Sequence, residues 1–116
     1  MDDIRSNAAE ALEKAADAFE SGELQWIQGC LGWAENGTAC ARGALLYAST
    51  GSQRGFLVEG RNTVTVAERA MGFSALMSTH IASLPGWNDR PGRTVDEVID
   101  RMKEGAKRLR NGEPID

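Results

Sequence analysis

The segment spanning residues 84–98 (LPGWNDRPGRTVDEV) constrains the fold more than any other part of the chain. Pro85-Gly86 is predicted to end a helix, because proline lacks a backbone N–H and its ring collides with the preceding helical turn. Thr94 is followed three residues later by Glu97, the spacing of a capping box, which predicts that a new helix starts there. Trp87 lies between these signals and is expected to cover the junction of the two helices.

Asn88 and Asp89 follow this tryptophan and can be interpreted in two ways. Their side chains can bond backbone amides that follow them, which would make a turn. They can also line a binding site together with Trp87. We favour the turn, because buried tryptophans and turn-forming Asn and Asp are common parts of helix corners.

Apolar residues recur at spacings of three and four in four segments, which predicts four amphipathic helices. Capping signals precede two of them at Thr65–Glu68 and Thr94–Glu97, and Thr38 is a candidate cap for a third. The predicted helices span residues 4–20, 38–49, 66–83 and 95–109.

The segment over residues 24–36 has neither a clean helical nor an alternating pattern. Asn36-Gly37 is a hairpin-type turn signal and favours short extended pieces, while a helix over residues 24–34 is the alternative. We therefore expect a mainly α fold, a single domain over residues 1–116 with four to five helices and room for one short β-hairpin near residues 25–38.

Composition places the chain among ordinary globular proteins, with 41% hydrophobic and 26% charged residues over 116 positions. The formal net charge is −4, which disfavours nucleic-acid binding because that depends on neutralising phosphates with Lys and Arg. No apolar stretch is long enough for a signal peptide or a membrane span, so a cytoplasmic location and no membrane contact are expected. The basic last helix keeps nucleic acid as the weakest alternative.

Catalytic and metal chemistry find little support in the sequence. Cys30, Cys40 and His80 are the only soft metal ligands, and a structural zinc site usually takes four in close pairs. No nucleophile turn or oxyanion loop accompanies a Cys–His pair, and His80 is expected to be a half-buried residue bonded to a carbonyl. We therefore predict no metal, no cofactor and, on balance, no enzymatic activity.

Trp33 is the tryptophan that we expect to be accessible at the surface, because it lies beside glycine and an acidic turn. Tryptophan and arginine are enriched at interface hot spots, so an exposed indole suggests a binding anchor.

The sequence also resembles a family of small uncharacterised domains from actinobacteria and their bacteriophages. The resemblance rests on Trp26-Ile27-Gln28-Gly29 after an alanine-rich helix, on the segment 37–45, and on Trp87-Asn88-Asp89 followed by Thr94-Val95-Asp96-Glu97-Val98. Residues 51–64 depart from the pattern. The resemblance implies a cytoplasmic actinobacterial or phage protein, in host cytoplasm if phage-encoded, and carries no assigned activity.

The leading functional hypothesis is a non-enzymatic binding or regulatory protein, encoded by a phage and acting on a host protein. The alternative is small-ligand binding or hydrolysis in a pocket near Trp87, Asn88 and Asp89, completed by Arg42 and His80. That alternative requires these polar groups to converge on a cavity rather than to bond one another. A homodimer through the Gly/Ala-rich helix that contains Gly43 and Ala44 stays open.

Overall fold

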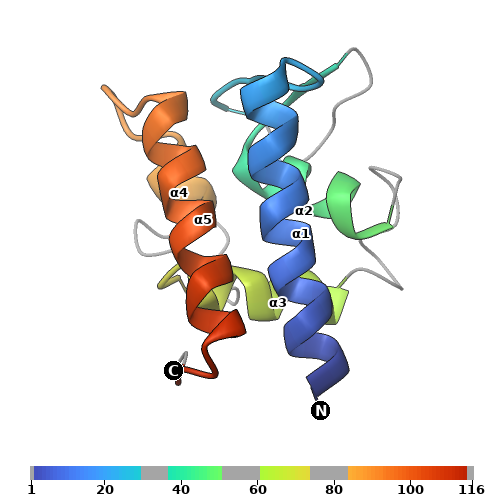
Figure 1. Ribbon diagram of the computed structural model, residues 1–116. Helices are drawn as coiled ribbons and strands as arrows, with labels where there is room; N and C mark the ends of the chain where they lie inside the picture. The colour runs from blue at the N-terminus through green and yellow to red at the C-terminus, as the bar shows by residue number, and fades with distance from the viewer. Residues whose placement is uncertain (1, 30–36, 51–60, 74–83, 115–116) are drawn as a thin grey trace.

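Two long helices, α1 (Asp2–Ser21) and α5 (Val95–Arg110), lie side by side and run in opposite directions along the front of the molecule (Figure 1). The structure is a computed structural model, and it describes residues 2–29, 37–50, 61–73 and 84–114. Three shorter helices pack behind this pair: α2 (Ala41–Thr50), α3 (Arg61–Ala70) and α4 (Leu84–Asn88). The predicted fold class, mainly α with four to five helices, is confirmed by these described elements.

Small residues let the front helices approach each other and α3 closely. The face that α1 turns to the core is largely alanine, including Ala8, Ala15 and Ala16, which are fully buried. On α5, a Cβ atom built at Gly105 would lie 3.2 Å from Leu12 Cδ1 and 3.2 Å from Met71 Cγ. Glycine in mid-helix costs roughly 1 kcal/mol relative to alanine, and this close contact explains why it is tolerated here.

The sequence between α1 and α2 contains a two-stranded sheet made of β1 (Gln25–Trp26) and β2 (Thr38–Ala39). Gln25 lies opposite Thr38 and Trp26 opposite Ala39, in parallel register. Short extended segments were expected here and are present. The two strands are parallel, however, so they do not form a hairpin, whose strands must be antiparallel. The helix over residues 24–34, the alternative, is excluded for the described part, because Gln25 and Trp26 are in β1.

Helix α2 starts three residues later than predicted, and Thr38 is in β2 rather than at the cap. Cys40 takes the cap position: the Gly43 N–H donates to its Sγ at 3.5 Å and the Ala44 N–H to its carbonyl at 2.9 Å. The backbone N–H groups at a helix start need acceptors, and here a thiol supplies one.

Helix α3 differs most from its prediction, residues 66–83, because it begins at Arg61 and ends at Ala70. Thr65 is therefore inside the helix and is not its cap. The end is set by Gly72, which has a φ of +96° and donates to the Arg69 carbonyl, while Phe73 N–H donates to Glu68 O. This pair of bonds is a Schellman motif, which closes a helix where glycine can adopt a left-handed conformation. Residues 74–83 lie outside the described part.

Pro85-Gly86 was predicted to end a helix, and this prediction is wrong. The two residues lie in the first turn of the short helix α4. The first N–H groups of a helix have no intrahelical acceptor, so proline loses nothing there and its fixed φ suits the helical conformation.

The helix that follows this corner begins as predicted, because α5 starts directly after a complete capping box. Glu97 N–H donates to Thr94 Oγ1 at 3.3 Å, and Thr94 N–H donates to Glu97 Oε1 at 2.9 Å. The second bond lowers the pKa of Glu97 below its ordinary value, and the cation of Arg93 adds to this effect.

The lowered pKa predicts a pH dependence of folding stability. Because the folded-state pKa of Glu97 lies below the unfolded value, its stabilisation is present above the unfolded pKa and is lost as the pH falls through the folded pKa. Glu97→Gln should therefore destabilise the protein near neutral pH, with the difference from wild type shrinking between about pH 5 and pH 3. Urea denaturation across that range measures the difference. A difference that does not change with pH would contradict the assignment.

No helix in the described ranges is long and apolar enough to cross a membrane.

Candidate functional site

Asn88 is the centre of a network that joins α4, β1 and α2. Its side chain is fully buried. Its Oδ1 accepts from Trp26 Nε1 at 2.6 Å and from the Ala41 N–H, the first residue of α2, at 2.9 Å. Its Nδ2 donates to the Ile27 carbonyl at 3.2 Å. Asn88 thus caps a helix that lies far from it in sequence, and both ends of its amide have partners.

Asp89 and Gln28 extend this network toward the surface. Asp89 Oδ1 accepts from the Gly29 N–H at 2.8 Å and from Asn88 Nδ2 at 2.9 Å. Gln28 Nε2 donates to the carbonyls of Asn88 and Arg90 at 3.0 and 2.9 Å. These bonds attach the chain segment after β1 to the corner after α4.

Trp87 is 9% exposed and packs as predicted for a residue that covers a helix junction. Its ring lies 5.5 Å from that of Phe73, and the Arg93 guanidinium is 4.0 Å from its centroid. Arg93 Nε also donates to the Trp87 carbonyl at 3.1 Å. A cation held over an indole is favourable, so the arginine stabilises the corner while it shields the ring.

Arg42 forms a buried ion pair with Glu68, linking α2 to α3. Its Nε and Nη2 reach the two carboxylate oxygens at 2.6 and 2.8 Å, a bidentate arrangement. Arg42 is 8% exposed and Glu68 is fully buried. Burial raises the pKa of the Glu68 carboxyl, and the arginine opposes that rise. The carboxylate is thus fully occupied by its partner.

A hollow of about 360 Å³ borders Trp87 on the side of α5. Arg93 and Arg101 line it together with three carboxylates, those of Glu97, Asp100 and Glu104. Arg93 pairs with Glu97 at 3.3 Å, and Arg101 Nε donates to the Met71 carbonyl at 2.8 Å. The two arginines are therefore already bonded within the protein, and Arg101 holds α5 against the end of α3.

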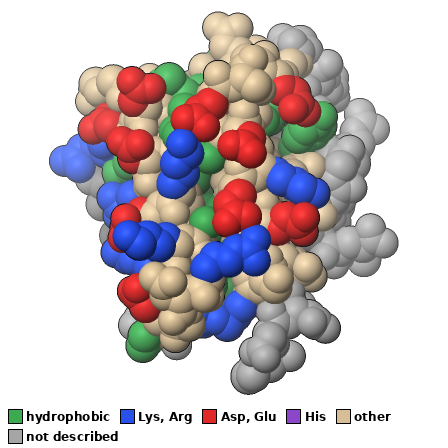
Figure 2. Space-filling view, in the orientation of Figure 1, with side chains coloured by type: hydrophobic (Ala, Val, Ile, Leu, Met, Phe, Trp, Pro, Cys, Tyr) green, Lys and Arg blue, Asp and Glu red, His purple; other side chains and the backbone are tan. Residues whose placement is uncertain are grey.

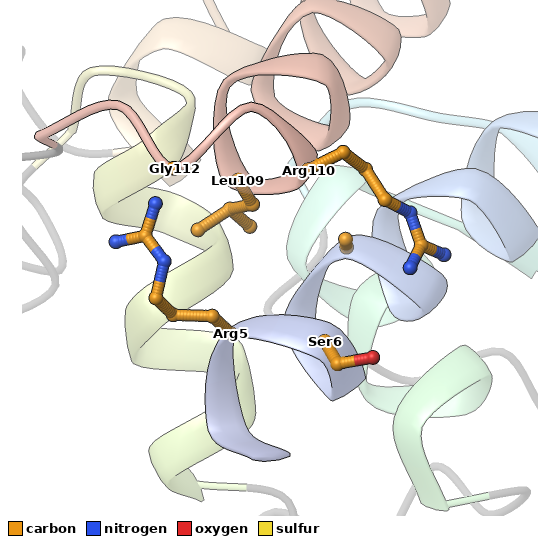
Figure 3. Close-up of a pocket in the computed structure, with 6 residues that line it drawn as sticks. Arg5, Ser6, Leu109, Arg110 and Gly112 are labelled. Carbon is orange, nitrogen blue, oxygen red and sulfur yellow. The ribbon is translucent and has the colours of Figure 1, made fainter. Parts of the chain in front are cut away.

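A second hollow, of about 250 Å³, lies where the start of α1 meets the end of α5 (Figure 3). Arg5 and Arg110 lie on opposite sides of it, with Leu109 between them. Arg5 Nη2 donates to the Glu113 carbonyl at 2.8 Å, and Arg110 forms a bidentate pair with Glu13. Both cations already have partners within the protein, so little charge in this hollow is available to bind a ligand.

The third hollow, of about 500 Å³, lies between the end of α1 and the start of α5. We call it the acidic hollow; it is lined by Phe19, Glu20, Val95, Asp96, Ile99 and Asp100. Acidic side chains gather across this upper part of the front face (Figure 2). This hollow combines three apolar residues with a lining whose charges are all negative.

A model of DUF6197, a family of unknown function, matches residues 4–108, a range that includes nearly every described element. The chain belongs to this family. Comparison with curated proteins and with solved structures gave no match.

In this DUF6197 domain, the predicted site residues do not share one described cavity. Trp87, Asn88 and Asp89 lie together at the corner, but of these only Trp87 borders one of the three hollows described above. Arg42 faces Glu68 instead. Trp33 and His80 lie outside the described residues, so their predicted roles stay predictions. The polar side-chain atoms of Asn88 and Asp89 bond each other, the Trp26 indole and backbone groups between Ile27 and Ala41, whereas the sequence favoured a local turn with bonds to the amides that follow them.

Two features of the DUF6197 domain were missed by sequence reasoning. Glu68 was assigned to a capping box, whereas it is the partner of Arg42. The signal that could have found this pair is a charged residue on each of two otherwise apolar helix faces. The acidic hollow was missed because its residues come from opposite ends of the chain, and no local pattern joins Phe19 to Ile99.

Proposed function

We propose that this DUF6197 domain is a non-enzymatic protein-binding module and that the acidic hollow is its binding surface. The observation that carries the proposal is the composition of the hollow. Phe19, Val95 and Ile99 supply apolar surface, while Glu20, Asp96 and Asp100 supply negative charge. An apolar centre with a polar rim is the usual arrangement of protein interfaces.

The charges at the end of α1 support this proposal, because helix stability does not explain them. The last turn of α1 contains no basic residue, and Glu20 lies there. A helix carries partial negative charge at its C-terminus, so a carboxylate at that position is unfavourable by roughly 0.3–1 kcal/mol. The ion pair between Glu20 and Lys103 of α5 offsets part of that cost.

Catalysis or small-ligand binding at the corner has less support. A reactive pocket needs polar atoms that are available to a substrate. Within the described residues, no buried side-chain nitrogen or oxygen lacks a hydrogen-bond partner. The network around Asn88 instead supports a rigid scaffold for a surface formed by α1 and α5.

The resemblance to actinobacterial and phage domains suggests the setting of this binding. We propose that the domain acts in the cytoplasm, on a host protein if it is phage-encoded. The partner would recognise a preformed, rigid surface, because both helices that frame the hollow are packed against the common core.

Selection from an unbiased displayed peptide library tests the proposal. Peptides that bind the folded domain should be enriched, and backbone NMR shifts should place them at residues 19–20 and 95–100. The matched control is the same selection on the domain denatured in urea. Failure to enrich any peptide beyond that control would overturn the proposal, as would binders that all map to other surfaces.

A further inference from the structure

We infer that the acidic hollow receives an arginine side chain presented by a basic segment of the partner protein. This inference rests on the proposed function and specifies the chemistry of its partner.

The lining of the hollow matches the two parts of an arginine side chain. Phe19 and Ile99 are 7% and 6% exposed, so each presents only a small apolar surface. The aliphatic stem of an arginine can cover such a surface while its charged head reaches polar groups at the rim. The carboxylates of Glu20 on α1 and of Asp96 and Asp100 on α5 supply acceptors around that surface.

Lys103 shows that a cation is stable at this rim. Its Nζ lies 2.8 Å from Glu20 Oε2, and the hydrogen bond to Glu20 is the largest cause of a raised Lys103 pKa. Asp17 and Asp100 add to the rise. The protein therefore already holds one ammonium among these carboxylates.

One lysine leaves this region with an excess of negative charge. The hollow is lined by three carboxylates, those of Glu20, Asp96 and Asp100, and by no cation, and Lys103 at the rim pairs with only one of them, Glu20. A surface of one sign attracts and orients a partner of the opposite sign before contact. The partner segment should therefore be basic.

Arginine fits this rim better than a metal ion or a lysine. Within the described ranges, no three His, Cys, Asp or Glu residues are placed to hold a metal ion together. Spread carboxylates instead suit the planar guanidinium, whose five donors can bond more than one acceptor at once.

The test uses a short alanine-based peptide with several arginines, and a second peptide in which uncharged citrulline replaces each arginine. The arginine peptide should bind, with NMR shifts at residues 19–20 and 95–100, and the citrulline peptide should bind at least about tenfold more weakly. Equal binding of the two peptides, or shifts confined to other surfaces, would overturn the inference.

Variants distinguish binding of the peptide at the hollow from general attraction between opposite charges. The double variant Asp96→Asn/Asp100→Asn should weaken binding of the arginine peptide by about tenfold. The matched control, Glu10→Gln/Glu113→Gln, makes the same change in net charge at exposed sites outside the hollow and should change affinity by less than about twofold. Equal losses in both variants would overturn the inference. Asp100→Asn alone should show a smaller loss, and circular dichroism verifies that each variant is folded.

The outcome also separates this inference from the proposed function. Library peptides that lack arginine but still map to the hollow would overturn the arginine assignment and leave the binding module supported. The absence of any peptide binder would count against both. Light scattering tests the other occupant, a second copy of the chain: self-association that is lost in Asp96→Asn/Asp100→Asn would overturn the inference.

Discussion

Replacing Glu68 by alanine should lower the free energy of unfolding by about 3–5 kcal/mol, because it leaves the buried Arg42 without a partner. The pair is bidentate, and the carboxylate is fully buried, so water cannot easily replace it. Urea denaturation followed by circular dichroism measures the loss. A loss below about 1 kcal/mol would mean that Arg42 turns to solvent and that the pair contributes little.

Two further variants show whether the loss in stability comes from removing the ion pair or from leaving a buried charge without a partner. The double variant Arg42→Met/Glu68→Leu removes both charges and should come within about 2 kcal/mol of wild type, because two desolvation costs disappear with one attraction. The matched surface pair, Arg110 with Glu13, should lose less than about 1 kcal/mol in Glu13→Ala.

Asn88→Ala should be the next most damaging change, at about 3 kcal/mol, because several buried groups lose their partners together. The indole N–H of Trp26, the first N–H of α2 at Ala41 and the Ile27 carbonyl all bond this one side chain. Thermal unfolding measures the loss. Fluorescence should shift as well, because Trp26 would lose its hydrogen bond.

Asn7→Ala is the matched control, since Asn7 is an exposed asparagine on α1. It should change the free energy of unfolding by no more than about 0.5 kcal/mol. Equal effects of the two substitutions would show that the Asn88 network does not stabilise the corner.

Local signals in the sequence predicted the helices whose boundaries depend on nearby residues. The start of α5 follows from Thr94 and Glu97, and its end from Asn111-Gly112, because capping groups lie within one turn of the helix they close. Helix α1 follows from its apolar spacing. The fold class was accessible for the same reason, since amphipathic helices of this length must pack on one another.

The remaining errors involve partners distant in sequence. Thr65–Glu68 has the spacing of a capping box, but Glu68 bonds Arg42, which is 26 residues away. Asn88 supplies an acceptor for the start of α2, 47 residues away, so no local pattern marked that start correctly. Asn88 and Asp89 were predicted as site residues because they are polar and follow Trp87, and their bonding partners could not be inferred before the corner was placed against β1.

The packing of α1 against α5 has a consequence for biosynthesis. The bond between Lys103 and Glu20 spans 83 residues, and the core includes Leu109 near the end of the chain. While the protein is being made, α1 leaves the ribosome before α5, and its alanine-rich face then has no α5 to cover it. Compaction must therefore wait until α5 has been made, and a nascent chain stalled before α5 should stay sensitive to protease.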